Sequence, residues 1–365
     1  KHIANVDSSA MVWLFASHTH SAPALDQHKP QLGATTPDYV ESVASSICEA
    51  VDDVYETEGS ECHSVRLTRV DMSGLSVHRR KRPWTHRIRP GPKKSAVGMG
   101  PNFKVPVQSH ADRLDFLDET GRTILVMWQW ACHPTSEPNR SVVSPDYPGA
   151  VREELRRDLG PIPVVFLQGF SGDARPPSLL TFRDNPLKRV IFGRKFRPFW
   201  PSEHAAWNSE IARRVSDREN VLKESEFARD DGWSVWASRR QLPATTFVRG
   251  SKTSDVVFQF GRIGPLGLVG VSAEPSFGQV PSTISGSDSL GASEMQRALE
   301  PTWWCGYLEN VYGYLPTPEQ VLQGGYEVEG FCHAFGCEGL ALDGPQRAKQ
   351  VLEQIERELM VADRR

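Results

Sequence analysis

The chain has no apolar run long enough to cross a bilayer. Its longest apolar runs, Met11–Ala16 and Thr123–Ala131, have the length of a β-strand, whereas a membrane-spanning helix needs about 20 apolar residues. Positive charge is not in excess either, because 42 Lys and Arg stand against 45 Asp and Glu, a net charge of −3. A dedicated nucleic-acid binder normally carries a basic excess. We therefore expect a soluble protein, cytoplasmic or secreted, with no transmembrane segment and no nucleic-acid partner.

Cysteine is scarce, and the six cysteines form no Cys-x-x-Cys pair. Scattered cysteines in a chain of 365 residues are typically buried or free. Cys332 and Cys337 are the closest in sequence, so a bridge between them stays open as an alternative. The chain begins KHIANVDSSA, which has neither an initiator Met nor the pattern of a signal peptide. We expect residues upstream of Lys1 to be missing.

Several catalytic motifs are absent as well. The sequence contains no HExxH helix, no P-loop and no GxGxxG fingerprint. The segment Gly169–Asp173, GFSGD, differs from the GxSxG nucleophile elbow. A serine-triad hydrolase therefore has little support.

The residues that are present suit a globular α/β protein. The chain is 39% hydrophobic and 24% charged, with 10 Trp and 16 Phe, which is enough apolar material for a sizeable core. We expect one catalytic domain over residues 1–365, with a mixed sheet flanked by helices and polar residues at the strand ends. Apolar runs predict strands over 11–17, 65–70, 123–131, 163–168, 256–260 and 266–271. Periodicity and N-cap signals predict helices over 39–54, 145–159, 204–228 and 345–360, with irregular loops over 78–104 and 177–203.

Three polar motifs follow predicted strands. Ser17–Ser21 reads SHTHS, and His18 and His20, two residues apart, are expected to point to the same side. His133 follows the strand that ends near Ala131, and Glu274 follows the strand that ends near Val271. Each motif alone is compatible with a structural role. Together they offer two or three imidazoles and a carboxylate, a set that suits Zn²⁺ with an open coordination position.

A fourth motif is rich in Gly and Tyr. It reads YGYLPT over 312–317 and continues as GGYE over 324–327. A phenol binds a metal poorly while it is protonated, its free pKa being about 10, but a metal can draw off that proton. A neutral phenol can instead donate a hydrogen bond to a developing oxyanion. The alternative is a turn region that packs on the core.

These residues resemble the neutral/alkaline non-lysosomal ceramidase family. The matching stretches occur in the family's order and cover most of the chain. They are SHTHSAP at 17–23, VHRR at 77–80, GPN at 100–102, ACHPTS at 131–136, SPDYPG at 144–149, FLQGFSGDARP at 166–176, AEPSF at 273–277, and GYLPT with GGYE at 313–327.

The resemblance implies one zinc ion per chain and a set of roles. By position, the metal ligands are His18, His133, Glu274 and Tyr314, and the catalytic residues are His20, Tyr326 and Arg79. The resemblance implies that His20 acts as the acid/base or oxyanion partner and that Tyr326 faces the scissile carbonyl. Arg79 matches an arginine of an Asn-Arg motif, although His78 stands where the family has Asn. Asp173 and Arg175, in the Gly-Asp loop, are expected to bind substrate.

The chain departs from the family pattern in three ways. Arg175 stands where the ceramidases carry a Ser in their Gly-Asp-x-Ser-Pro motif, so the nucleophile is expected to be water. The chain is too short for the family's additional C-terminal β-sandwich domain. The family's N-terminal lead to the HxH region, with its strand, is also expected to be missing upstream of Lys1. The resemblance therefore implies the reaction more firmly than it implies ceramide as the substrate.

Our hypothesis is zinc-dependent cleavage of an amide bond in an N-acyl compound, a small-molecule or lipid-like substrate. A metal-dependent esterase or deacylase acting on an acylated sugar or lipid is the first alternative. A non-catalytic binding protein of the same fold is the second, and the complete ligand set argues against it.

Two segments concentrate positive charge. Residues 78–94 hold eight Arg and Lys without an acid, and residues 183–197 hold six against Asp184. They are either solvated loops, a surface for an acidic partner or anionic membrane, or a mouth that draws in an anionic substrate. In the last case arginine would grip a carboxylate, phosphate or sulfate in bidentate fashion.

Overall fold

The computed structural model describes residues 11–82, 97–139, 141–180, 195–229, 234–251, 255–281 and 301–362. Two large mixed sheets form its centre. The first has the order β10-β1-β4-β5-β6, with β5 and β6 parallel and the other neighbours antiparallel. The second has the order β11-β13-β14-β16, with β14 and β16 parallel. The predicted class, α/β with a mixed sheet flanked by helices, is confirmed, with two sheets in place of one.

The first sheet consists of β1 (Ser64–Asp71), β4 (His110–Leu117), β5 (Thr123–Trp130), β6 (Val164–Gln168) and β10 (Val221–Ala228). The second consists of β11 (Val235–Pro243), β13 (Asp255–Ile263), β14 (Leu266–Val271) and β16 (Thr302–Cys305). The longer helices are α2 (Pro37–Glu56), α3 (Asp146–Leu159), α5 (Pro201–Ser216) and α9 (Gly344–Ala362). Short helices are α7 (Pro318–Gln323), α8 (Cys332–Phe335) and the π-helix η7 (Tyr326–Gly330). Short strands are β2 (Val77–Lys81), β3 (Gly98–Asn102), β7 (Ala174–Arg175), β8 (Leu179–Leu180), β9 (Lys195–Phe196), β12 (Val248–Arg249), β15 (Glu274–Pro275), β17 (Tyr314–Leu315) and β18 (Gly339–Leu340).

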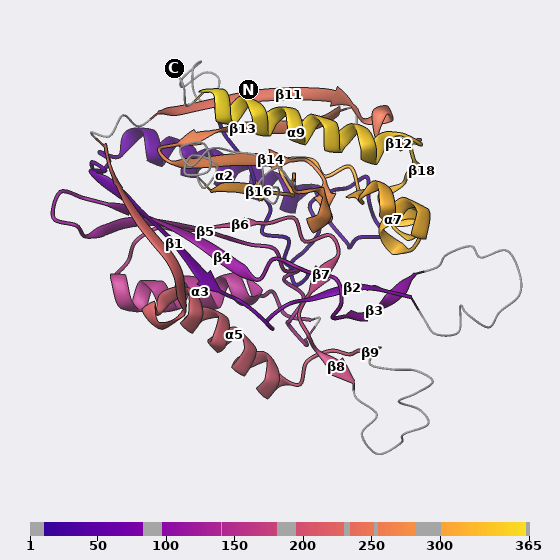
Figure 1. Ribbon diagram of the computed structural model, residues 1–365, viewed down its shortest axis with the longest axis horizontal. Helices are drawn as coiled ribbons and strands as arrows, with labels where there is room; N and C mark the ends of the chain where they lie inside the picture. Colours follow the sequence, from indigo (N-terminus) through magenta and orange to yellow (C-terminus); the bar gives the residue numbers. More distant parts are fainter. Residues whose placement is uncertain are drawn as a thin grey trace, which may run out of the picture.

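The two sheets stack face to face, and helices cover their outer faces (Figure 1). Between the sheets, Leu114 and Leu167 of the first pack with Leu268 and Trp303 of the second. Helix α9 covers the outer face of the second sheet, while α3 and α5 cover the outer face of the first. The central apolar strands β5 and β14 are therefore covered on both faces, as their continuous apolar sequences require.

Most predicted elements are confirmed within one or two residues of their ends. Helix α2 begins at Pro37 with the Thr36 side chain accepting a hydrogen bond from Tyr39 N, the cap that the Thr-Pro pair predicts. The strand predicted over 11–17 is instead a segment outside both main sheets, with one isolated bridge from Phe15 to Leu308, which follows β16. Cys332 and Cys337 are free thiols, so the alternative of a bridge between them is wrong.

Two predictions need larger corrections. The helix predicted over 204–228 ends at Ser216, and residues 221–228 form the edge strand β10. Val221, Ser225 and Phe227 alternate with more exposed neighbours, a period of two that the longer helical window obscured. The predicted loop over 78–104 contains strands β2 and β3, which pair with each other, and its residues 83–96 lie outside the described part.

No helix in the described ranges is long and apolar enough to span a membrane.

Candidate functional site

The candidate site lies where the carboxyl ends of both parallel strand pairs meet. His133 follows β5, Ser171 follows β6, Glu274 follows β14 and Tyr307 follows β16, each within two or three residues of the strand end. Backbone hydrogen bonds join these turns, from Gly306 N to Gln168 O and from Gly172 N to Pro275 O. Polar side chains from both sheets therefore converge at one edge, as in open α/β sheets.

His18 and His20 reach this edge from the N-terminal segment. Ala16 N donates to Tyr307 O, and His20 N donates to Pro134 O, so the segment lies between the turns that follow β16 and β5. His18 has a left-handed backbone, with φ of 62°, and its ring stacks on Tyr307 with 4.0 Å between the centroids. The Nε2 atoms of His18 and His20 are 3.4 Å apart. The expectation that both rings face one side is confirmed.

The His133 ring is held in one tautomer. Its Nδ1 lies 2.7 Å from Ser171 O and 2.9 Å from Ala174 O, both of which can only accept, so Nδ1 carries the proton. Nε2 therefore presents a lone pair, and Arg79 Nη1 lies 3.2 Å from it. Burial, with the positive charge of Arg79, lowers the pKa of His133 to about 4. The ring is neutral at physiological pH and available as a metal ligand.

Glu274 faces that lone pair. Its Oε1 lies 2.7 Å from His133 Nε2 and 3.6 Å from His18 Nε2. Burial raises the pKa of Glu274, but the positive charge that His18 and His133 carry when they are protonated outweighs burial and holds the pKa well below its usual value. The carboxylate is thus ionised while only 2% of its residue surface is exposed.

Tyr314 stands beside Glu274 in register, because β15 and β17 pair in parallel with these two residues opposite each other. Arg79 Nη2 donates to Tyr314 Oη at 3.1 Å. Burial and the Glu274 carboxylate raise the pKa of Tyr314 well above its usual value, and Arg79 opposes this. Tyr326, on η7, completes this side, with 5.4 Å between the ring centroids of the two tyrosines. Tyr326 is 39% exposed and is open to solvent.

The donor set fits a divalent cation. His133 Nε2 and Glu274 Oε1 are two acceptors in close contact, and Oε1 has no hydrogen-bond partner among the described residues. Arg79 Nη1 lies near His133 Nε2, but no described group donates to Oε1, so the contact stays repulsive unless a further cation binds both atoms. Ring nitrogens of His18, His20 and His133 all lie within 4.8 Å of one another. Imidazole and carboxylate are the ligand types that Zn²⁺ takes in hydrolases.

Two solved structures of ceramidases are similar to this chain in fold. A neutral ceramidase from Pseudomonas aeruginosa has a TM-score of 0.66 and 14% sequence identity, and the match covers 98% of this chain and 64% of that one. A ceramidase complexed with C2 has the same TM-score at 13% identity, over 100% of this chain and 64% of that one. The chain has the neutral ceramidase fold. It spans 64% of the length of these relatives, and neither a family profile nor a curated protein matches its sequence.

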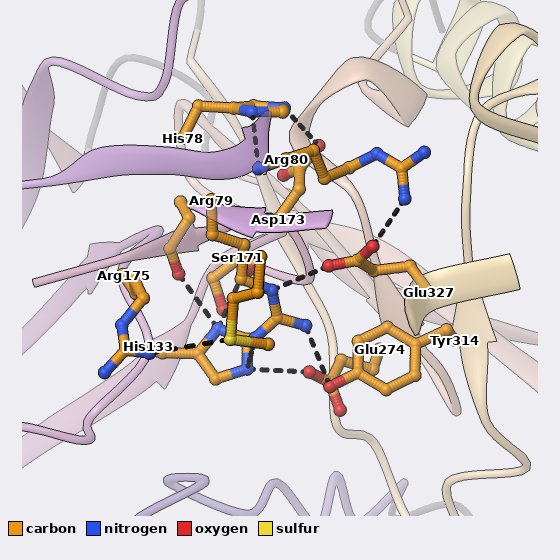
Figure 2. Close-up of polar contacts among 12 residues, drawn as sticks. His78, Arg79, Arg80, His133, Ser171, Asp173, Arg175, Glu274, Tyr314 and Glu327 are labelled. Carbon is orange, nitrogen blue, oxygen red and sulfur yellow. Dashed lines mark hydrogen bonds and ion pairs between the residues drawn. The ribbon is translucent and has the colours of Figure 1, made fainter. Parts of the chain in front are cut away.

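Within the ceramidase fold, seven of the predicted site residues come together. They are His18, His20, His133, Glu274, Tyr314, Tyr326 and Arg79. Arg79 is 5% exposed, and its nitrogens are engaged by Glu327, His133 and Tyr314 (Figure 2). Arg79 is therefore a buried part of the site, in contact with two of the proposed metal ligands. Arg79 and Arg80 both lie in β2 and are buried, so this end of the basic segment 78–94 is no solvated loop. Most of segments 78–94 and 183–197 lies outside the described residues.

Asp173 and Arg175 stand apart from this group. Asp173 is 1% exposed; it accepts hydrogen bonds from Phe277 N and Gln320 Nε2, and His78 Nε2 lies 3.3 Å away. Burial raises the pKa of Asp173, and these contacts outweigh burial and lower the pKa below its usual value. The guanidinium of Arg175 lies over the Phe196 ring, 4.5 Å from its centroid.

A pocket of about 1070 Å³ lies on the Asp173 side of β2. Apolar residues such as Val97, Phe103 and Val280 line it together with the basic residues Lys81, Arg82 and Lys104. Its lining includes none of the histidines of the candidate metal group. The pocket adjoins the site through the turn at 171–174, because Asp173 lines the pocket while the carbonyls of Ser171 and Ala174 hold His133.

Two residues of the site escaped the sequence reasoning. Tyr307 stacks on His18, and its hydroxyl pairs with Ser171 Oγ at 3.1 Å. Glu327 is buried against Arg79. Tyr307 lies just beyond a strand that the apolar pattern did not reveal, so no signal marked it. Glu327 lay inside the GGYE stretch, where the adjacent Tyr326 drew the functional interpretation.

Proposed function

We propose that this protein is a metal-dependent hydrolase that cleaves the amide bond of an N-acyl compound, with Zn²⁺ held by His18, His133, Glu274 and Tyr314. The observation that carries the proposal is the contact of 2.7 Å between the lone pair of His133 Nε2 and the ionised Glu274 Oε1. Both groups are almost fully buried. The fold adds support, since its structural relatives are ceramidases.

Zn²⁺, when bound, supplies Lewis-acid chemistry that lowers the pKa of water toward about 7 and polarises a carbonyl. The chain supplies the rest. His20, at the exposed side of the group with its Nε2 3.4 Å from His18 Nε2, would take a proton from the attacking water and pass it to the leaving amine. Burial of the imidazole, together with the charges of the neighbouring His18 and His133, lowers the pKa of His20 well below its usual value. His20 is therefore a base at neutral pH, although part of the residue is exposed.

Tyr326 is the residue best placed to meet the substrate carbonyl. Its phenol is half-exposed beside Tyr314, and burial and Glu274 raise its pKa, so it remains a proton donor. A neutral phenol can donate to the oxyanion that forms when water adds to the carbonyl. Arg79 donates to Tyr314 Oη and thereby favours the phenolate that a metal ligand requires.

The substrate is proposed to be amphipathic and anionic. The pocket beside the site combines apolar walls with Lys81, Arg82 and Lys104, and its basic residues outnumber its two acids, Asp173 and Glu319. An N-acyl amino acid, or a phosphorylated or sulfated amide, would place its acyl chain against the apolar walls and its charge near these cations. Attraction between exposed charges is screened at high ionic strength, so kcat/KM for such a substrate should fall as salt is added.

The test is a substrate panel on the purified protein: matched N-acyl amides and esters, each with and without a carboxylate on the amine or alcohol half. We expect the anionic amides to react fastest, and the variant Lys81→Ala/Lys104→Ala to lose that preference. Faster hydrolysis of the matched esters would reassign the reaction to an esterase. Equal rates for neutral and anionic amides at low and high salt would remove the anionic substrate. No turnover by zinc-loaded protein on any member would favour a binding protein of this fold.

A further inference from the structure

Glu327 is a buried carboxylate shared between two arginines. Its Oε1 accepts from Arg79 Nε at 2.7 Å, and its Oε2 accepts from Arg80 Nη1 (Figure 2). Arg80 also donates to the carbonyls of Gln320 and Gly324, which fixes the second guanidinium against helix α7. Glu327 thus connects strand β2 to the π-helix η7. π-Helical turns are frequent at functional sites.

The far side of Arg79 faces the atoms proposed to bind the cation. Nη1 lies 3.2 Å from His133 Nε2, and Nη2 lies 3.1 Å from Tyr314 Oη. Arginine remains protonated in proteins, so this is a permanent positive charge beside a proposed cation site. At such separations, and away from water, an unopposed charge repels a divalent cation strongly. Among the described residues, Glu327 is the carboxylate that accepts a hydrogen bond from Arg79, while the Glu274 carboxylate acts on Arg79 only through its charge.

We propose that Glu327 is a positioning residue whose carboxylate balances and orients Arg79, so that Arg79 can hold Tyr314 and His133 without repelling a divalent cation bound between them. This inference rests on the proposed function, because it concerns the same metal group. Glu327 hydrogen-bonds Arg79 and Arg80 and is not itself a proposed ligand. The inference gives this buried glutamate a defined effect on metal binding.

The experiment removes metal from the protein with a chelator and then measures its affinity for Zn²⁺ by competition with a chromogenic chelator. Glu327→Gln keeps the size of the side chain and removes its charge. We expect it to weaken Zn²⁺ binding by about 10- to 100-fold, the usual effect of losing a residue that orients metal ligands. Glu329→Gln is the matched control, since Glu329 lies on the same π-helix and is exposed, and its affinity should equal that of the wild type.

A double variant separates charge balance from general damage. If Glu327→Gln acts through the unopposed charge of Arg79, adding Arg79→Met should restore part of the lost affinity. A merely structural role predicts that Arg79→Met/Glu327→Gln binds Zn²⁺ no better than Glu327→Gln alone, and this result would overturn the inference.

Loss of the carboxylate leaves two buried cations, which can prevent folding. Should Glu327→Gln fail to fold, Arg80→Met/Glu327→Gln removes one cation together with the anion, and its affinity should remain at least tenfold below that of Arg80→Met alone. Equal affinities for that pair would contradict the inference.

If the wild type binds Zn²⁺ and Glu327→Gln binds it equally well, only this inference fails. If the wild type binds no Zn²⁺, the proposed function fails with it.

Discussion

His133 is the residue with the most constrained surroundings in the site. Two backbone carbonyls fix its proton on Nδ1, so its Nε2 can only accept or coordinate. The carbonyls come from the turn after β6, whereas the histidine follows β5. The parallel pairing of these strands therefore sets the tautomer that a metal requires.

Replacing His133 should abolish metal binding. For His133→Ala we expect the zinc content, measured by elemental analysis, to fall from about one equivalent to none, with no measurable turnover. His28→Ala is the control, because His28 is exposed and is not among the histidines whose ring nitrogens cluster, and its zinc content should stay unchanged. A full equivalent of zinc in His133→Ala would remove His133 from the ligand set.

Ser171 is the hydroxyl nearest to the Gly-Asp loop in sequence, and we predict that it is no nucleophile. Its Oγ pairs with Gln168 Nε2 and with the Tyr307 hydroxyl, and neither partner is a base. Ser171→Ala should keep near-normal kcat, with a loss of stability of about 1–3 kcal/mol because buried partners lose a hydrogen bond. Intact-mass measurement during turnover checks this, and an acyl group trapped on Ser171 would contradict it.

Asp173 should make the protein sensitive to acid. Its pKa in the folded state lies below the usual value of 3.8 because hydrogen bonds outweigh burial, so its contribution to stability is complete above about pH 3.8 and is lost as pH falls through the lower, folded-state pKa. Asp173→Asn should lower the free energy of unfolding at pH 7 by about 2 kcal/mol. The difference from the wild type should shrink below pH 4 in denaturant titrations. A constant difference from pH 7 to pH 2 would show that Asp173 acts without its charge.

At the scale of elements, the turn after β6 and the strand β15 touch through a glycine. A Cβ on Gly172 would lie 2.8 Å from Glu274 O and 2.9 Å from Pro275 O, both backbone atoms that cannot swing away. Gly172→Ala should therefore displace the strand that carries Glu274, costing about 1–3 kcal/mol and weakening Zn²⁺ binding.

Gly59→Ala is the matched control for Gly172→Ala. A Cβ on Gly59 meets nothing within 4 Å, so its stability and zinc affinity should be those of the wild type. Thermal unfolding and chelator competition measure the two effects. Wild-type zinc affinity in Gly172→Ala would show that the turn does not set the position of Glu274.

The elements that the sequence predicted well are those with a strong local pattern. Helices α2, α3 and α9 and strands β1, β5, β6, β13 and β14 each carry a clear periodicity or apolar run. Strands β10 and β11 are half-exposed edge strands rich in charge, and their period of two was hidden. The HxH, ACHP and AEP motifs were recoverable because polar residues directly follow apolar runs in the sequence. Tyr307 and the environment of Glu327 depend on pairings between distant segments, which no local pattern contains.

At the scale of the whole molecule, four layers bring the site together. Two sheets pack on each other, with α9 on one outer face and α3 with α5 on the other (Figure 1). The stacking places the carboxyl ends of β5 and β6 beside those of β14 and β16, where Gly169 bridges to Cys305. The proposed ligands His133 and Glu274 follow strands of different sheets, so their arrangement should depend on the intact fold. A metal bound only to the folded state would stabilise that state by mass action.

The most direct test of the central claim is turnover of an N-acyl amide by protein stripped of metal with a chelator, with zinc content measured on the same sample. We expect no hydrolysis from the stripped protein, recovery on addition of about one equivalent of Zn²⁺, and a rise in Tm that His133→Ala does not show. Full turnover by a sample without measurable zinc would contradict the account.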